Sequence, residues 1–445
     1  MRPQTLISAL YGEVRGYHRL SIRRLVAANE GIPRAILAIR SDRLFQEHVH
    51  RCIGRFPLYA ERVKAHRGSL PRSGQLVRPE ELPIWTRRDQ IDFFASEERP
   101  ADGHYIHETG GSTGLVVRLH VTRESYEWRT AIADRAYGWA GAEEGTHSLH
   151  IWGATRSANR LHGYKVFIHR VLQRRTYFNA FRQFTDDERA ACCDVINRMK
   201  PDAIVGYTGI LVDIARFARE HNALRWKAPT LISTAETLQC GQRELLIGQL
   251  ADDVFDSYGS REFMNIATEC SQHDGYHIAS DNLRVEVVDR DGRPVEAGVE
   301  GRIVVTDFHN AATPFVRYEV GDNGVMAPSD RPCRCGRPFP LLQSVEGRSQ
   351  DIIHTHHGWV SAINLQDVLE YFDWVEGYQL LQPSPDRLII KLLTRVELTE
   401  ERLLPLRSRL HTQLGDLAVT FERVNELSRR PNGKIELVTR ALDVA

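Results

Sequence analysis

In the middle of the chain, short apolar runs alternate with longer amphipathic runs, and this alternation limits the possible folds more than any other feature. The runs DAIVGY, PTLIST and DVFDSYG predict buried strands, and the segments between them predict helices. Strands that alternate with helices require crossover connections, so we expect the three strands to be parallel. Ligands bind at the carboxyl ends of such strands, where the clusters Thr234–Glu236 and Tyr258–Ser260 fall.

The flanking segments have a different character. The first hundred residues are rich in arginine and predict mainly helices. Residues 282–308 alternate polar and apolar side chains around Asp291 and Gly292, which predicts an antiparallel hairpin. Near the C-terminus, two strands precede a helix with a stripe of four leucines: Leu403, Leu406, Leu410 and Leu414. A further strand follows this helix, and together these elements predict a compact α+β unit.

The expected fold class is therefore α/β with two domains. Residues 1–346 are expected to form a large N-terminal domain of parallel-sheet β-α-β layers with a smaller β-rich part. Residues 347–445 are expected to form a small C-terminal α+β domain, joined to the first by a hinge.

Composition excludes several classes of partner. The chain has 445 residues, with 58 Lys and Arg and 58 Asp and Glu, and no basic stripe stands out, so we expect no nucleic-acid partner. No uncharged stretch approaches the roughly 18 residues of a membrane span, and Glu13 and Arg15 interrupt the only N-terminal apolar run, so we expect neither a membrane partner nor a secretory signal. Seven cysteines, an odd number, favour a reducing compartment, and we expect a cytoplasmic protein.

A loop rich in glycine lies between residues 107 and 122, in the stretch HETGGSTGLVVRLHVT. Its glycines, Gly110, Gly111 and Gly114, leave the backbone N–H groups accessible, and Ser112 and Thr113 add hydroxyl donors, so the loop could cradle a phosphate. It is not a Walker loop, because no Gly-Lys-Ser/Thr follows. Taken alone, the pattern fits a plain mobile turn equally well.

Six short motifs occur in a fixed order along residues 80–445. They are TGGSTG at 109–114, TAE at 234–236, YGSREF at 258–263, RYEVGD at 317–322, GRSQD at 347–351 and PNGKI at 431–435. In identity and order they resemble the motifs of the adenylate-forming (ANL) superfamily, in its phenylacetate–coenzyme A ligase and CapK-like branch. Six motifs in family order are far more specific than any one of them.

The resemblance implies a role for each motif. It implies a phosphate loop that begins at Thr109 and a nucleotide-contacting set made of Thr234, Ala235, Glu236, Tyr258, Gly259 and Ser260. It implies that Glu262 holds Mg²⁺, that Asp322 and Arg348 bind the ribose of ATP, that Gln350 is the hinge pivot and that Lys434 serves adenylation. We expect Lys434, Glu262 and Arg348 to be catalytic, because attack of a carboxylate on ATP joins two anions and needs cationic neutralisation.

Simpler readings of single residues remain open. Asp322 follows a glycine and could cap a turn, Glu262 could be a solvated carboxylate, and Lys434 could be an exposed turn lysine. The chain also departs from the family pattern. Its glycine-rich loop lacks the usual lysine, leaving Arg118 as the nearest cation, and Arg261 stands where a small hydroxyl residue is usual.

Two short cysteine-containing segments predict a metal site. Cys270 and His273 have Cys-x2-His spacing, and Cys333 and Cys335 lie in PCRCG. Four such ligands match a closed, structural zinc site, and the family shows cysteines and histidine at similar places. Free thiols are the alternative reading, and His277 and His309 compete with His273 for the fourth position. The remaining cysteines, Cys52, Cys192, Cys193 and Cys240, are expected to be ordinary core or surface residues.

The resemblance also indicates where an acid would bind. Candidates for the acyl pocket are Trp152, Gly153, Tyr207, Thr208 and Gly209, since IVGYTG resembles a family segment that lines it. This apolar set favours an aromatic or medium-sized acid.

We therefore expect an ATP-dependent ligase that converts a small carboxylic acid to acyl-AMP and then transfers the acyl group to a thiol, for which we expect coenzyme A. Transfer to an amine, a hydroxyl or a carrier protein is the first alternative. A non-catalytic nucleotide-binding regulator is the second. The implied cofactors are ATP, Mg²⁺ and structural Zn²⁺, and family likeness alone indicates a homodimer.

Overall fold

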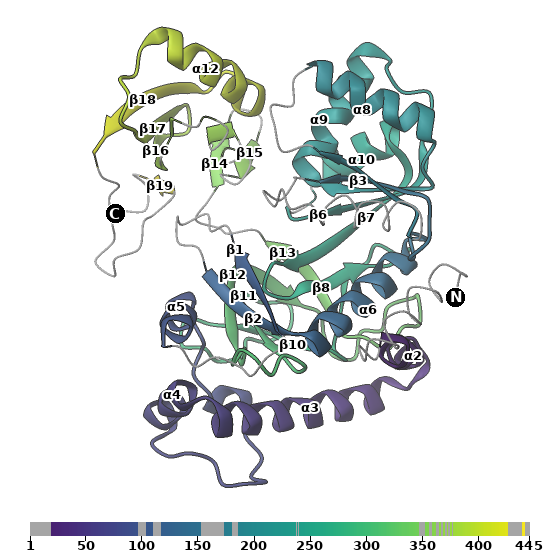
Figure 1. Ribbon diagram of the computed structural model, residues 1–445, viewed down its shortest axis with the longest axis vertical. Helices are drawn as coiled ribbons and strands as arrows, with labels where there is room; N and C mark the ends of the chain where they lie inside the picture. The colour runs from purple at the N-terminus through teal and green to yellow at the C-terminus, as the bar shows by residue number, and fades with distance from the viewer. Residues whose placement is uncertain are drawn as a thin grey trace. The chain divides into compact units, whose positions relative to one another are not determined.

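The structure is a computed structural model that describes residues 19–96, 104–109, 117–152, 173–179, 186–236, 238, 240–346, 352–355, 358–361, 365, 368–369, 372, 374–375, 377–425 and 438–440. The chain divides into two compact units (Figure 1). The large unit comprises Met1–Glu108 and Arg118–Glu346, and the small unit comprises Thr109–Val117 and Gly347–Ala445. Each unit has a hydrophobic core of its own.

The large unit begins with helices, as the sequence predicts. These are α2 (Arg19–Ala28), α3 (Arg34–Arg55), α4 (Pro57–Arg67) and α5 (Arg87–Ala95), with short 3-10 helices η1 (Asn29–Gly31) and η2 (Pro79–Glu81). Helix α3 buries Phe45, Val49 and Cys52 in the main core of the unit. A capping box of Thr86 and Asp89 begins α5, because each residue bonds the backbone N–H of the other.

One eleven-stranded sheet forms the centre of the large unit, in the order β10-β11-β12-β13-β9-β8-β7-β6-β5-β3-β4. Its parallel part contains β3 (Ser148–Trp152), β4 (Arg175–Asn179), β5 (Ala203–Tyr207), β6 (Ala228–Thr234) and β7 (Ala251–Ser260). The predicted strand–helix alternation is confirmed, with helices α8 (Asp186–Met199), α9 (Thr208–His221) and α10 (Cys240–Gln249) between these strands.

Helices cover both faces of the parallel part. Alternate residues of β5 point to opposite faces, so that Ile204 packs with α8, α9 and α10 while Val205 packs on the other side with the end of α6 (Arg123–Trp139). Figure 1 shows α8, α9 and α10 gathered on one side of these strands. The strands are buried on both faces, as expected for a parallel sheet.

The β-rich part continues the same sheet, so it is not a separate layer. It contains β8 (Met264–Glu269), β9 (Tyr276–Ile278), β10 (Leu283–Val288), β11 (Glu300–Asp307), β12 (Tyr318–Met326) and β13 (Leu341–Glu346). All of its pairings are antiparallel, and β10 pairs with β11 as the predicted hairpin. The sheet changes from parallel to antiparallel between β7 and β8.

Two strands outside this sheet, β1 (His104–Thr109) and β2 (Val117–Thr122), form a two-stranded ribbon. They flank the glycine-rich loop, whose residues 110–116 lie outside the described part of the chain. Within the described residues, no helix combines the length and apolar content needed to cross a bilayer.

The small unit is α+β, as predicted. It contains a ribbon of β14 (Ile352–Thr355) and β15 (Gly358–Ser361) and a four-stranded sheet in the order β18-β17-β16-β19. The sheet strands are β16 (Gly377–Ser384), β17 (Arg387–Leu393), β18 (Ala418–Val424) and β19 (Val438–Arg440), and α12 (Glu400–Leu414) completes the unit. The predicted leucine stripe of α12 is buried in this core, and the helix continues through Pro405.

Candidate active site and a cysteine–histidine cluster

The carboxyl ends of β5, β6 and β7 lie side by side, because these three strands are parallel neighbours. Tyr207 is the last residue of β5, Thr234 the last of β6, and Tyr258, Gly259 and Ser260 end β7. The structure therefore brings together, at one edge of the sheet, three segments that are distributed between Tyr207 and Ser260 in the sequence. This edge is where parallel sheets bind ligands.

A network of short hydrogen bonds joins the first two of these segments. The Thr208 hydroxyl lies 2.6 Å from the Ser233 hydroxyl and donates to the Glu236 carbonyl at 2.9 Å. The Glu236 carboxylate accepts from the backbone N–H of Gly209 at 2.7 Å, at the N-terminus of α9. A carboxylate is favourable there because the helix dipole is positive at this end. The network fixes the loop after β6 relative to α9.

Ala235 has an unusual backbone conformation within this loop. Its φ of 73° lies in the left-handed region, which residues other than glycine adopt only under local constraint. Its neighbours Thr234 and Glu236 supply that constraint, since Thr234 donates to the Ser257 carbonyl at 3.0 Å and Glu236 is bonded as described above. The loop is therefore held in a strained, exposed turn at this edge of the sheet.

Gly259 is required by close packing at the end of β7. A side chain there would place its Cβ 1.9 Å from the Met264 carbonyl oxygen, because β7 and β8 approach closely where their register shifts. The bulge between Tyr258 and Gly259 precedes the tight turn at residues 261–263, which carries Glu262.

Two acidic side chains of separate motifs are bonded to tyrosines across the antiparallel part of the sheet. The Tyr258 hydroxyl donates to Asp322 Oδ2 at 2.9 Å, and the Tyr318 hydroxyl donates to Glu262 Oε1 at 3.3 Å. Strand β12 carries Asp322 and Tyr318, and it is not a neighbour of β7 or β8 in the sheet. These side chains therefore connect the β7–β8 turn to β12.

Tyr318 was not among the residues predicted from the sequence. It is almost fully buried and packs edge-on against Phe315 and Phe263, with ring centroids 4.9 Å and 5.8 Å away. This packing fixes the hydroxyl that Glu262 accepts from. Only its position at the start of the RYEVGD segment could have drawn attention to it.

Two aromatic rings lie together at the ends of β3 and β5. The rings of Trp152 and Tyr207 are 4.8 Å apart between centroids and inclined by 38°. They provide one apolar wall beside Thr208, which is 1 % exposed. Of the five predicted acyl-pocket residues, the structure brings together Trp152, Tyr207, Thr208 and Gly209, whereas Gly153 lies outside the described residues.

Several predicted site residues cannot be placed. Those outside the described residues are Gly110, Gly111, Ser112, Thr113, Gly114, Arg348, Gln350 and Lys434. Thr109 is described only as the last residue of β1. Their roles stay predictions.

Three of the predicted ligands, Cys270, Cys333 and Cys335, lie in one cluster, but the histidine beside them is His277 and not His273. Cys270, His277, Cys333 and Cys335 place their potential ligand atoms within 4.8 Å of one another. The Sγ atoms of Cys270 and Cys333 are 3.6 Å apart, and Cys335 Sγ lies 3.2 Å from His277 Nε2. Burial lowers the pKa of His277 to about 4, so its imidazole is neutral at pH 7, the form that binds metals. The set has the composition of a structural zinc site.

His273 is not part of this cluster, which corrects the prediction. Its Nδ1 lies 3.1 Å from Glu269 Oε2, and its Nε2 lies 3.1 Å from Asp253 Oδ1. Both ring nitrogens are thus engaged by carboxylates. The bond to Glu269 raises the pKa of His273, because a carboxylate favours the protonated ring.

A buried carboxylate beneath the site was also missed. Asp256 accepts from the Tyr276 hydroxyl at 2.8 Å and from the Leu238 N–H at 3.4 Å, beside the loop that carries Glu236. Burial raises the pKa of Asp256 to about 7. It precedes Tyr258 by two residues and so faces the same side of β7, which is the only sequence signal that pointed to it.

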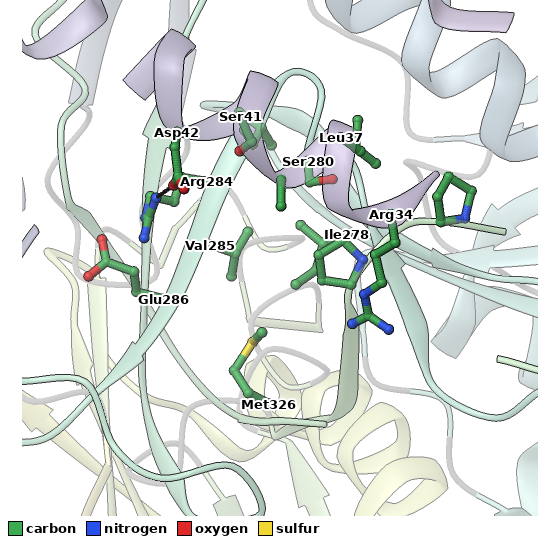
Figure 2. A pocket seen from close by; sticks show the side chains of 14 residues that line it. Arg34, Leu37, Ser41, Asp42, Ile278, Ser280, Arg284, Val285, Glu286 and Met326 are labelled. Carbon is green, nitrogen blue, oxygen red and sulfur yellow. Dashed lines mark hydrogen bonds and ion pairs between the residues drawn. The ribbon is translucent and has the colours of Figure 1, made fainter. Parts of the chain in front are cut away.

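A cavity of about 220 Å³ lies elsewhere in the large unit, between α3 and the strands β9, β10 and β12 (Figure 2). Its walls are mainly apolar, and Figure 2 shows Arg34, Asp42 and Arg284 around them. Asp42 and Arg284 pair with each other at 2.7 Å. None of the predicted site residues lines this cavity, so it is separate from the edge described above.

Comparison with known proteins finds one family model and two curated relatives of low identity. A model of the CapK C-terminal domain matches residues 352–441. Protein CapK of Staphylococcus aureus is 24% identical over 246 residues, which is 54% of this chain and 53% of that protein. Phenylacetate-coenzyme A ligase of Escherichia coli (strain K12) is 26% identical over 173 residues, 38% of each protein. The chain thus spans about half or less of these curated relatives.

Solved structures with the same fold include an acyl-coenzyme A ligase. A 2-hydroxyisobutyryl-CoA ligase in complex with 2-HIB-AMP and CoA, in the thioesterification state, has a TM-score of 0.61 at 20% identity, covering 93% of this chain and 92% of that one. The same ligase in the postadenylation state has a TM-score of 0.60 at 19% identity, and the match covers 94% of this chain and 92% of the ligase chain. At this identity the likeness establishes the fold, and it confirms the predicted α/β architecture with a small C-terminal domain.

Proposed function

We propose that this chain, which is similar to protein CapK and to phenylacetate-coenzyme A ligase and has the fold of an acyl-coenzyme A ligase, activates a small carboxylic acid with ATP. The product of the first step would be an acyl-AMP. In the second step the acyl group would pass to a thiol, for which coenzyme A is the first candidate. The relatives named above include two ligases that act with coenzyme A.

The bond between Tyr258 and Asp322 is the observation that carries the proposal. It joins two of the six motifs across the sheet at 2.9 Å, at the edge that also holds the strained loop around Ala235. A nucleotide bound along this edge would have its base near Thr234–Glu236 and its ribose hydroxyls within reach of the Asp322 carboxylate. The proximity of the three described motifs, TAE, YGSREF and RYEVGD, supports a single nucleotide site.

The residues of the site fit a magnesium nucleotide. Glu262 is a half-buried carboxylate oriented by the Tyr318 hydroxyl, and carboxylates are the usual protein ligands of Mg²⁺. Mg²⁺ would neutralise phosphate charge during adenylation. We propose that Lys434 supplies a second positive charge and that Arg348 binds the ribose. The hydroxyl-rich edge around Thr208 and Thr234 would orient the nucleotide.

We propose that the acid lies against the ring pair of Trp152 and Tyr207. These rings are tilted at 4.8 Å and present an apolar surface beside Thr208. Such a wall favours an aromatic or medium-sized acyl group over a charged one. A Cβ at Gly209 would lie 2.9 Å from Glu236 Oε2, so the glycine leaves room for that carboxylate beside the proposed pocket.

The second step is proposed to use a different arrangement of the domains. Residues 347–445 would rotate about Gln350, which removes Lys434 from the site and brings the segment after the hinge to the acceptor. One hinge would then serve two chemically different reactions. An amine, a hydroxyl or a carrier protein in place of coenzyme A is the second candidate for the acceptor.

ATP–pyrophosphate exchange with a panel of aryl and alkyl acids tests the first step. We expect exchange with one class of acid, and Asp322→Ala should lower its rate at least about tenfold because a ribose contact is lost. Asp330→Ala, which changes an exposed aspartate, is the control. ATP binding without exchange for any acid would instead favour a nucleotide-binding regulator.

Replacement of Lys434 separates the two steps. Lys434→Ala should abolish acyl-AMP formation but leave thioester formation from supplied acyl-AMP nearly unchanged. If both reactions fall equally, the proposed division between the two domain arrangements is wrong. Supplied coenzyme A, a carrier protein and simple amines in the same assay identify the acceptor.

We further propose that the cysteine–histidine cluster holds structural zinc. Zinc–sulfur bonds of about 2.3 Å in a tetrahedron separate the sulfur atoms by about 3.8 Å, close to the 3.6 Å between Cys270 and Cys333. Four protein ligands leave no position for a reacting water. Metal analysis should find about one zinc per chain. His277→Ala should lose it while His273→Ala keeps it, and the reverse result would restore the original assignment.

A further inference from the structure

Positive charge is concentrated at the beginning of the large unit. Between Arg19 and Arg78 the sequence contains thirteen arginines and lysines but only four acidic residues, whereas the whole chain has 58 of each. This surplus of nine is balanced by the rest of the protein and is therefore invisible in the net charge. Such asymmetry points to an anionic partner.

Only part of this charge is neutralised within the protein. Arg19, Arg23, Arg67 and Arg78 pair with carboxylates, at 2.6 to 2.9 Å in their shortest contacts. Arg62 pairs with Asp89, and Arg43 pairs with Glu47 on the outer side of α3 at 2.8 Å. Within the described residues, no carboxylate pairs with the following exposed cations: Arg24, Arg40, Arg51, Arg55, Lys64 and Arg72. The unpaired cations therefore face solvent.

The outer face of α3 combines these cations with apolar side chains. Ile36, Ile39, Arg40 and Arg43 recur at helical spacing on the side opposite the buried Phe45 and its neighbours. Ile39 is 65% exposed and Ile36 is 43% exposed. Figure 1 shows α3 along an edge of the large unit, with the loop after α4 projecting beyond it.

The loop after α4 presents a leucine beside this face. Gln46 of α3 bonds both the N–H and the carbonyl of Val77, at 2.9 Å and 2.8 Å, and His50 Nε2 lies 2.8 Å from the Gln75 carbonyl. The backbone on both sides of Leu76 is thus fixed to α3, yet the Leu76 side chain is 78% exposed. A loop held in this way displays Leu76 to a partner.

We propose that this surface binds an anionic lipid membrane. We name it the α3 surface, and it consists of Ile36, Ile39, Arg40, Arg43, Arg51, Leu70, Arg72 and Leu76. Arginines would contact lipid phosphates while the isoleucines and leucines enter the interface between headgroups and acyl chains. The protein would lie on the membrane without crossing it, which departs from the expectation that the chain has no membrane partner.

Lipid explains the surface better than nucleic acid. Single-stranded nucleic acids are bound by exposed aromatic rings among basic residues. The aromatic residues between Arg19 and Arg78 are Phe45, Phe56 and Tyr59, and all three are buried. Exposed aliphatic side chains beside arginine instead match an interfacial membrane-binding surface.

Co-sedimentation of the full chain with vesicles tests the proposal. We expect binding to phosphatidylcholine vesicles that contain about 30 mol% phosphatidylglycerol, little binding to pure phosphatidylcholine, and a loss of at least about tenfold between low salt and roughly 0.5 M salt. Absence of binding to the anionic vesicles at low salt would overturn the proposal. Tighter binding to an oligonucleotide than to vesicles would also overturn it, in favour of nucleic acid.

Variants locate the binding surface. Arg40→Glu combined with Arg51→Glu, and separately Leu76→Asp, should each weaken vesicle binding at least about tenfold. Arg290→Glu with Arg293→Glu, and Leu404→Asp, make matched changes at exposed positions elsewhere and should leave binding unchanged. Circular dichroism checks that each variant is folded. Equal losses in the control variants would show that general charge, and not the α3 surface, determines binding.

Discussion

The two units are held together by different kinds of interior. In the small unit, the core is mainly aliphatic, with Ile390 of β17 and Leu406 of α12 both fully buried. In the large unit, charged groups are buried together with the apolar core. Arg129 of α6 pairs with Asp307 of β11 at 2.7 Å, and both side chains are 0% exposed. Arg135 with Asp281 and Arg317 with Glu286 form further nearly buried pairs.

The two kinds of interior specify the fold in different ways. Aliphatic side chains stabilise by burial and can repack, so many leucine arrangements have similar energy. Each charged group of a buried ion pair needs its one partner at the correct position. Arg129 and Asp307 are 178 residues apart in the sequence, so only the correct fold brings them together. We infer that the large unit uses such pairs to fix helices on its long sheet, while the small unit relies on apolar packing.

The largest effect is expected from breaking the buried pair. Arg129→Met should lower the free energy of unfolding by about 3–5 kcal/mol, because Asp307 is left charged and unpaired in the interior. Urea unfolding followed by tryptophan fluorescence measures this. The double variant with Asp307→Asn should recover most of the loss. A double variant as unstable as the single one would contradict the idea that the unpaired charge causes it.

In the small unit, we expect a core substitution to destabilise the protein by creating a cavity and not by leaving a charge unpaired. Leu406→Ala should cost about 3 kcal/mol, since its side chain is fully buried in the apolar core. Leu404 on the same helix is 66% exposed, so Leu404→Ala is the control and should cost little. Hydrogen exchange of the β16–β18 amides reports the change. Similar effects of the two variants would show that this core is not packed as described.

The same difference decides how much the sequence could predict. The leucine stripe of α12 and the strand–helix alternation before Tyr258 are periodic patterns, and both are confirmed. The buried pair of Arg129 and Asp307 has no local pattern, because its partners meet only through the tertiary fold. Periodicity therefore predicts the elements and the apolar core but not the charged interior.

The site follows this rule as well. Ordered motifs identified Asp322 and Tyr258, which the structure joins by a hydrogen bond. Spacing selected His273 for the predicted metal site because it lies three residues after Cys270, but in the structure His277 of β9 lies beside the three cysteines, and β9 pairs with β13. The pairing of β9 with β13 places His277 beside the cysteines, and this pairing cannot be predicted from the spacing of residues in the sequence.

Acid is expected to lower the stability of the large unit more than that of the small unit. Burial lowers the pKa of His48, in the large unit, to about 4, so its neutral form is favoured in the folded state. The unfolded state has the higher pKa of about 6.5, so it binds the proton first and stability is lost as pH falls from about 6.5 towards 4. We expect this group to contribute a loss of about 2 kcal/mol between pH 7 and pH 5.

Unfolding measured at several pH values checks this contribution. His48→Gln should make the stability of the large unit less dependent on pH in this range, whatever its effect at pH 7. In the small unit His411 is the histidine whose burial is described, and it is exposed, so we expect exchange of the β17 amides to change little. An unchanged pH slope in the variant would mean that other groups cause the acid sensitivity.

The smallest effect tests whether charge pairs matter only when buried. Arg88 and Asp92 of α5 lie 3.1 Å apart, but their side chains are 73% and 42% exposed. Water screens such a pair, so Arg88→Ala should change the free energy of unfolding by less than about 0.5 kcal/mol, as urea unfolding can measure. A loss comparable to that of Arg129→Met would mean that ion pairing itself, and not burial, distinguishes the large unit from the small one.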